Sequence, residues 1–273
     1  MAVRHRFDES FVGMGWRRAA ELNLPTHSLA LAAQQVLCTA PLLVSFSLAK
    51  RHVASENIGD VLTRYLALSP AASNDVRPLF DNSLTVTSGD RILGLIFALV
   101  FSTAIAATQQ RWFELVWSQP RAPIVNSTFR QLCWVAGLCG YLIVVVYAGR
   151  AGHGVGRHVH AGRGAGPVVQ FAVSFVFFWW SQHVLLSGRI PWRRLIFGAA
   201  AMAMGMTILV GLSGFALSGQ IVSEVHDYGP IGATFVLSLW LVALSGLVCA
   251  GALIGQLIAQ RRANQSVAHP DRN

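Results

Sequence analysis

Polar side chains inside otherwise apolar stretches are the residues of this chain with the clearest potential for chemistry. Gln34 and Gln35 lie in one such stretch, and Gln170, Gln182 and His183 lie in another. A polar group in a membrane span prefers a partner inside the helix bundle to contact with lipid. These side chains could therefore line a shared polar path, or they could form hydrogen bonds between helices.

Pro41 follows the glutamine pair within the same apolar stretch. A proline inside a helix leaves one backbone hydrogen bond unmade and favours a kink. His183 precedes a short basic link that carries Arg189, Arg193 and Arg194. An ionisable residue inside a membrane marks a functional site, whereas a histidine at the membrane surface is simply solvated. Both interpretations of His183 stay open.

A glycine-rich segment at residues 153–160 holds His153, His158 and His160. Imidazoles bind zinc or copper, but such a site needs defined geometry and a third or fourth ligand. A solvated, pH-sensitive loop explains the same residues without a metal. We therefore expect neither a bound metal nor a cofactor.

Catalytic motifs are missing from the sequence. It contains no GxxxxGK[ST] phosphate loop, no HExxH and no GxSxG, and its few carboxylates fall in predicted loops. The four cysteines include no CxxC pair, so we expect neither a disulfide nor a zinc site. No enzymatic activity is predicted.

Long apolar runs are the elements that must position these residues. The 273 residues are 53% hydrophobic and only 12% charged, whereas a soluble domain carries about 25% charged residues. Six runs are suited to crossing a hydrocarbon core of ~30 Å as helices. They cover residues 27–49, 92–108, 132–148, 168–186, 195–217 and 233–259. We predict an all-α polytopic membrane protein with one six-helix domain at residues 1–260 and a polar tail at 261–273.

Shorter amphipathic helices are expected beside these spans, at residues 1–24, 56–68 and 109–119. The third of these carries Trp112 and Trp117, which suit the level of the lipid headgroups. Residues 71–90 are predicted to be mostly irregular, and residues 218–232 to form a short loop. Gly251 and Gly255 are four residues apart in the last span, a spacing that predicts close packing between helices.

The basic link at residues 187–194 predicts a tight turn, because Pro191 is tolerated in the first turn of the next helix. Short cytoplasmic loops collect Lys and Arg. With both termini inside, most of the cations lie on the inner side. These are Arg4, Arg6, Arg17, Arg18, Arg111, Arg121, Arg130, Arg189, Arg193, Arg194, Arg261, Arg262 and Arg272.

The net charge of +9 is therefore explained by membrane topology. It forms no continuous basic face of the kind that binds nucleic acid, and we expect no such partner. Anionic membrane lipids are the expected partners of these arginines.

Several segments resemble the YihY/BrkB family of bacterial inner-membrane proteins, once called ribonuclease BN. The segments are LALAA at 29–33 and PLLVSFSLA at 41–49, the aromatic segment at 112–117, FFWW at 177–180, IPWRRLIFGA at 190–199, and DYGPIGATFVLSLWLVALSGLVCAGALIG at 227–255. Gln34, Gln35 and the histidine-rich segment depart from the family pattern. The resemblance implies a six-helix inner-membrane protein with a role in transport or in handling envelope lipids, and it implies no catalytic residues.

Three functions are compatible with these features. The first is a transporter or permease for a small molecule, a lipid or an envelope component, with a polar cavity between the first, fourth and last spans. The second is a membrane scaffold or assembly protein with a dry interior. The third, a membrane nuclease, requires a divalent metal and an acidic cluster around Glu114 or Glu224, and the sequence does not support it.

Overall fold

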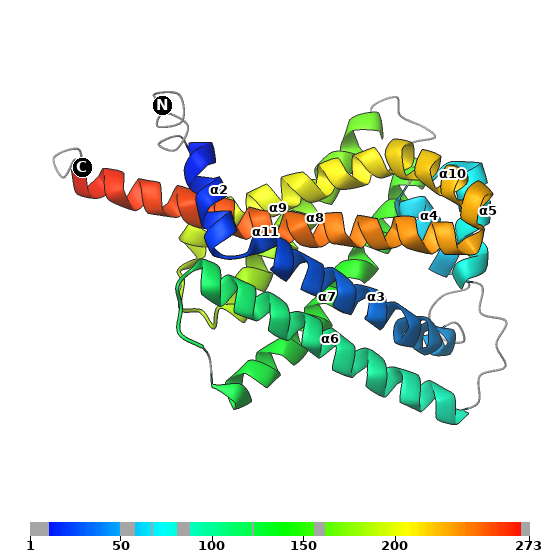
Figure 1. The fold of residues 1–273 in the computed structure, drawn as a ribbon, viewed down its shortest axis with the longest axis horizontal. Helices are drawn as coiled ribbons and strands as arrows, with labels where there is room; N and C mark the ends of the chain where they lie inside the picture. Colours follow the sequence, from blue (N-terminus) through cyan, green and yellow to red (C-terminus); the bar gives the residue numbers. More distant parts are fainter. Residues whose placement is uncertain are drawn as a thin grey trace.

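The computed structural model describes residues 11–49, 58–66, 68–80, 88–121, 123–155 and 162–268. Within these ranges all regular secondary structure is helical, so the prediction of an all-α membrane bundle is confirmed. The long helices are α3 (Leu24–Ala49), α6 (Ser88–Val116), α7 (Ile124–Val155), α8 (Gly162–Leu185), α9 (Trp192–Leu212) and α11 (Pro230–Ala268) (Figure 1).

Five stretches of the described residues are long and apolar enough to cross a membrane: Ile92–Val116, Asn126–Val145, Gly166–Leu185, Trp192–Tyr228 and Ile231–Gln265. α3 lies outside that set, because its side chains beyond Thr39 are outside the described residues. Its 26 residues nevertheless include no Asp, Glu, Lys or Arg. α3 is therefore the natural counterpart of the first predicted span.

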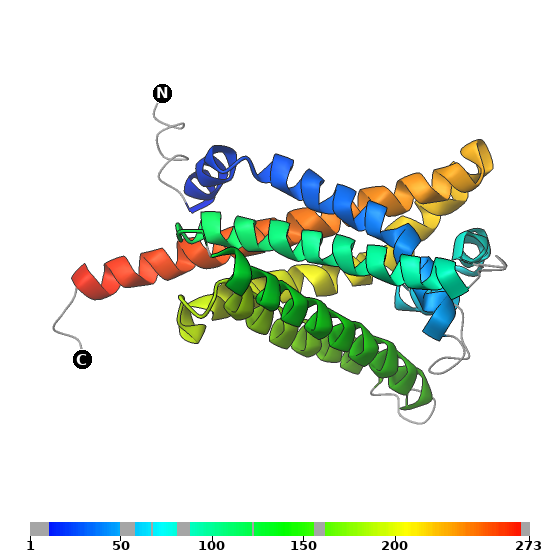
Figure 2. The same cartoon turned by 90° about the horizontal axis from the view of Figure 1, so that it is seen from below.

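The helices run back and forth along one long axis (Figures 1 and 2). One end, here called the termini end, carries α2 (Phe11–Glu21), the end of α11 and the α6–α7 and α8–α9 turns. The opposite end, here called the cap end, carries α4 (Ile58–Tyr65), α5 (Pro70–Phe80) and α10 (Ser218–Tyr228). The two basic turns predicted for the inner side thus share one end with α2.

Neighbouring long helices form a closed ring in the order α3, α6, α7, α8, α9, α11 and back to α3. α6 also reaches across the ring to α8 and α11. α6 and α7 lie close at the termini end and diverge toward the cap end (Figure 2). The contact between α6 and α7 is the least extensive around the ring.

Small residues let α9 and α11 pack backbone against backbone. A Cβ added to Gly255 would fall on the backbone of Gly198, and one added to Gly251 would lie 2.5 Å from the Met202 side chain. Such close approach is a common way for helices to associate in lipid, where no hydrophobic effect drives them together. The predicted packing role of Gly251 and Gly255 is confirmed.

The prediction of a separate interfacial helix after the second span is wrong, because α6 continues without a break to Val116. Trp112, Phe113 and Val116 are fully buried in the main apolar core, and Trp112 Nε1 donates a hydrogen bond of 3.1 Å to the Cys249 carbonyl. The polar residues before Trp112 contain no helix breaker. They mark a polar patch inside the bundle rather than the end of the span.

A second apolar core forms at the cap end, where α5 packs on α10 and the start of α11 and α4 packs on α5. Its buried residues are Leu66, Ala72, Val76, Leu217, Ile221, Ala233 and Val236. The predicted helix at residues 56–68 is confirmed by α4, whereas the irregular structure expected at 71–90 is wrong for the part that forms α5.

The short loop expected at residues 218–232 is also wrong, because most of it is α10. α9 reaches α10 through a π-helical turn, Ser213–Leu217, without leaving the helical path. The break comes at Gly229, whose φ of 64° and ψ of −150° are accessible to essentially no other residue. Gly232 then lies so close to the Glu224 carbonyl that no Cβ fits between them.

Candidate functional site

The two glutamines of α3 face different neighbours. Gln34 Nε2 donates a hydrogen bond of 2.9 Å to Thr108 Oγ1 of α6. Gln35 Oε1 accepts a hydrogen bond of 3.4 Å from Ser245 Oγ of α11. Gln34 Oε1 is buried and has no partner among the described residues. The two glutamines therefore join α3 to both of its ring neighbours, α6 and α11. The side-chain oxygen of Gln34 accepts no hydrogen bond from the described residues.

Pro41 lies in the second half of α3, and the helix continues through it. Its side-chain surroundings are outside the described residues, so the predicted kink stays a prediction.

Gln170 belongs to a polar cluster between α4, α7 and α8. Its Nε2 lies 3.1 Å from Tyr65 OH and 3.1 Å from Ser174 Oγ, and Tyr141 OH also lies 3.1 Å from Ser174 Oγ. Burial raises the pKa of the Tyr65 phenol, and the neighbouring Tyr141 adds to the rise. Tyr65 is therefore a neutral hydrogen-bonding group that fastens the cap to the bundle.

Gln182 is fully buried where α8 meets α9. Its Nε2 donates to the Phe178 carbonyl at 3.3 Å, and its Oε1 has no partner among the described residues. A Cβ on Gly198 would lie 2.8 Å from that oxygen. The carboxamide thus occupies space that exists because residue 198 is glycine.

His183 lies at the termini end, near the α8–α9 turn. Its ring stacks on Trp192 with a centroid distance of 3.9 Å and an interplanar angle of 20°. Its Nδ1 and Ser187 Oγ are both buried, and neither atom has a hydrogen-bond partner among the described residues. The next residue, Gly188, has a φ of 67° and lies against the imidazole. His183 therefore sits at the end of a span rather than in its middle.

The basic link forms the predicted tight turn. Pro191 is extended, with a φ of −65°, and precedes the first residue of α9. Arg189 Nη1 donates a hydrogen bond to the Pro120 carbonyl, which joins the α8–α9 turn to the α6–α7 turn. Arg193 and Arg194 are exposed in the first turn of α9. Arg189 thus joins the two turns at the termini end, whereas Arg193 and Arg194 are exposed.

The polar patch between α6 and α7 was missed by the sequence analysis. Gln110 Nε2 donates to Glu114 Oε1 at 3.1 Å, and Gln110 Oε1 accepts from Ser127 Oγ at 2.9 Å and Gln131 Nε2 at 3.2 Å. Gln131 also donates to Ser127 Oγ at 2.8 Å. Glu114 is only 5% exposed. Residues 110 and 114, and residues 127 and 131, are four positions apart, so each pair lies on one helical face. This spacing was the feature of the sequence that could have indicated the polar patch.

Gln256 of α11 is a second residue that the sequence analysis passed over. It is 3% exposed, and its Oε1 has no partner among the described residues. Three glutamines on α3, α8 and α11 therefore share one feature, a buried side-chain oxygen without a donor (Gln34, Gln182 and Gln256). The other polar groups join one helix to the next around the ring, and they do not converge on a single centre.

Metal ligands do not gather within the described residues, where no group of three or more His, Cys, Asp or Glu side chains is found. His153 lies in the last turns of α7, and His158 and His160 are outside the described residues. The four cysteines are free thiols.

A family model described as "Virulence factor BrkB" matches residues 16–273 of this chain, nearly its whole length. A search of curated proteins finds no match, and a search of solved structures finds none either.

Proposed function

We propose that this chain, which belongs to the BrkB virulence-factor family, is a transporter or permease for a lipid or another envelope component in a bacterial plasma membrane. Its termini end, with the two arginine-rich turns, would face the cytoplasm according to the positive-inside rule. The proposal involves no chemical step and no nucleic acid. Its required partners are membrane lipids and a small-molecule or lipid substrate.

The observation that carries the proposal is the set of unpaired oxygens on Gln34, Gln182 and Gln256. A buried acceptor without a donor costs about 1–3 kcal/mol, and a water, an ion or a ligand is the usual explanation. We infer that another state of the bundle admits water or a polar solute along α3, α8 and α11.

The helix contacts indicate which parts would move. α9 and α11 are locked by the close approach of Gly198 and Gly255, so they are expected to move as one body. α6 and α7 diverge and are joined near the termini end by hydrogen bonds around Gln110 (Figure 2). Opening between α6 and α7, with bending of α3 near Pro41, would disturb the least extensive contact of the ring and admit water to its interior.

Cysteine accessibility tests the path directly. In a chain whose four native cysteines are replaced, Gln34→Cys, Gln182→Cys and Gln256→Cys are labelled in intact cells with a small hydrophilic thiol reagent. Each should react well above the rate of Met202→Cys, a fully buried position between α9 and α11. Equal background rates at all four positions would refute a water-accessible path.

A second test addresses function. Gln34→Leu together with Gln35→Leu removes both glutamines of α3 and should alter the distribution of lipids or solutes in cells that depend on this protein. Unchanged expression combined with an unchanged distribution would show that the glutamines carry no transport role.

A scaffold without a transport path is the second candidate, because large apolar side chains are fully buried in the main core of the bundle. Trp112, Phe113, Leu195 and Met202 are each fully buried. A scaffold predicts that thiol labelling stays at background and that Gln182→Leu leaves the cellular phenotype intact.

A further inference from the structure

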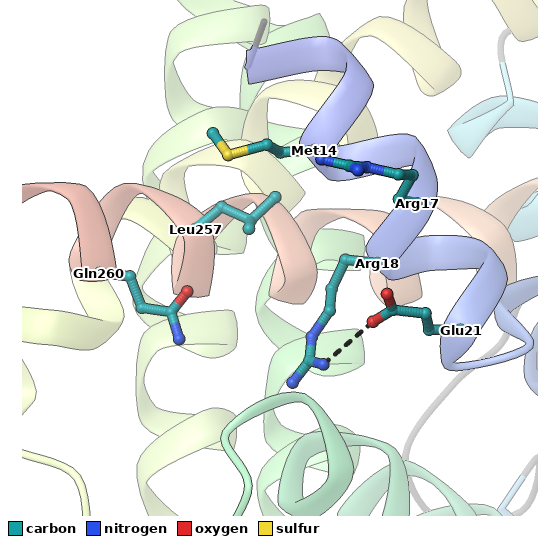
Figure 3. A pocket seen from close by; sticks show the side chains of 6 residues that line it. All are labelled: Met14, Arg17, Arg18, Glu21, Leu257 and Gln260. Atoms are coloured by element: carbon teal, nitrogen blue, oxygen red, sulfur yellow. Dashed lines mark hydrogen bonds and ion pairs between the residues drawn. The ribbon is translucent and has the colours of Figure 1, made fainter. Parts of the chain in front are cut away.

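A groove lies at the termini end, where α2 crosses α11 (Figure 3). It encloses about 480 Å³ and is open on one side. Its lining residues are Met14, Arg17, Arg18 and Glu21 of α2 together with Leu257 and Gln260 of α11. None of the three glutamines with unpaired oxygens lines this groove, although Gln256 directly precedes Leu257 in α11. The inference drawn from the groove does not depend on the transport proposal.

The groove has an apolar part and a charged part. Met14 and Leu257 provide apolar contact, and a Cβ on Gly15 would lie at an ordinary contact distance of 3.6 Å from Leu257 Cδ1. Trp16, on the same helix, is 74% exposed. Exposed tryptophans beside a membrane span are typical of the headgroup level. An occupant that is apolar at one end and charged at the other would match both parts.

Arginine dominates the charged part. Arg18 Nη1 forms an ion pair of 3.2 Å with Glu21 Oε2, and the two side chains are 34% and 63% exposed (Figure 3). An exposed pair of this kind contributes little stability, so an incoming anion can replace the carboxylate. Arg17 and Arg18 both line the groove, with their side chains running in different directions (Figure 3). A guanidinium group suits a phosphate, which it can bind through two parallel N–H bonds.

We infer that this groove binds the phosphate headgroup of an anionic glycerophospholipid, with Arg17 and Arg18 at the phosphate and an acyl chain against Met14 and Leu257. The apolar wall favours a lipid over free phosphate, which has no apolar part to bury. Basic pockets on the cytoplasmic side of a membrane helix are suited to such headgroups. Lipid bound here would hold α2 against α11.

The test uses the purified full-length protein in a neutral detergent, with lipid retention measured by native mass spectrometry. Phosphatidylglycerol should be retained in preference to phosphatidylcholine. Arg17→Gln with Arg18→Gln should weaken phosphatidylglycerol retention about tenfold or more. The control, Arg193→Gln with Arg194→Gln, removes the same charge from the same end and should change retention less than twofold.

Glu21→Gln is an independent variant for which the opposite change in lipid retention is expected. It removes the carboxylate that competes for Arg18, so phosphatidylglycerol retention should increase. Melting temperatures of all variants, measured in parallel, separate a binding defect from unfolding. An equal loss of phosphatidylglycerol retention in both double-arginine variants would show that surface charge alone explains the effect. Displacement of the lipid by inorganic phosphate at equal concentration would identify free phosphate as the ligand. Either result, or no increase for Glu21→Gln, overturns the inference.

Discussion

Two glutamines in the bundle interior have opposite hydrogen-bonding situations. Gln182 Oε1 has no donor among the described residues, whereas Gln110 bonds Glu114, Ser127 and Gln131. Deleting a buried polar group that has no hydrogen bond removes a desolvation penalty. Deleting one member of a hydrogen-bond network leaves its partners buried without hydrogen bonds. The same substitution should therefore have opposite effects at the two positions.

We predict that Gln182→Met leaves the free energy of unfolding unchanged or raises it, because the unpaired oxygen disappears and the side-chain volume is nearly kept. Gln110→Met should lower it by about 1–3 kcal/mol. Thermal unfolding of the purified variants in detergent provides the comparison, with Gln220→Met, at an exposed position of α10, as the control. Equal destabilisation at positions 110 and 182 would contradict this interpretation of the two side chains.

Glutamine and serine side chains form the hydrogen bonds between α6 and α7, while glycines carry the contact between α9 and α11. Polar contacts between helices in a membrane contribute modestly, about 0.6 kcal/mol on average. Backbone packing is sensitive to a single added methyl group. At the scale of helices, the ring therefore has one rigid contact and one that can open.

The rigid contact predicts a strong effect for Gly255→Ala. The added methyl group would fall on the backbone of Gly198, and forced separation of α9 and α11 should cost about 1–3 kcal/mol. Gly211→Ala is the matched control, since a Cβ there meets no atom within 4 Å and should be neutral or slightly stabilising. Melting temperatures that fall equally in both variants would show that the glycine contact is not the cause.

Side-chain hydrogen bonds fasten the cap near the π-helical turn, where Ser213 Oγ donates to the Leu66 carbonyl at 2.8 Å. Ser218 Oγ, 6% exposed, accepts a hydrogen bond of 2.9 Å from the Ser69 backbone N–H. Ser218→Ala should leave that N–H unmade and speed hydrogen exchange in α4 and α5, with little change in α9 and α11. Ser238→Ala is the control, because Ser238 bonds a carbonyl of its own helix. Exchange that rises uniformly would contradict a separate cap.

The whole molecule places α2, both arginine-rich turns and the end of α11 at one end, and α4, α5 and α10 at the other (Figure 1). An even number of crossings is the simplest arrangement compatible with this distribution. Most arginines of the described helices and turns then share the termini end, as the positive-inside rule requires of a cytoplasmic face.

Topology mapping tests this arrangement. Reporter enzymes fused after Arg121, after Gly188 and after the end of α11 should all report from the cytoplasm, and a fusion at Tyr228 should report from the outside. A fusion at Gly188 that reports from the outside would show that the protein has the opposite orientation in the membrane. Disagreement between the fusions at Arg121 and Gly188 would show that the two turns do not lie on the same face of the membrane.

The sequence alone determined the class of fold, because membrane spans are read from hydrophobicity over about 20 residues, a property that needs no knowledge of neighbours. It also predicted the Pro191 turn, α2, α4 and the close packing at Gly255. Each of these depends on local backbone chemistry or on residues a few positions apart. The five candidate polar residues, together with Pro41, were identified from their position in apolar runs.

Only the tertiary structure decided which neighbour each polar residue meets. It placed Gln34 against α6, Gln35 against α11, Gln170 beside Tyr65 of the cap and Gln182 beside Gly198. It also carried α6 through its polar patch to Val116. Whether a polar residue ends a span or continues inside the bundle depends on the hydrogen bonds that other helices supply, and those helices come from distant parts of the chain.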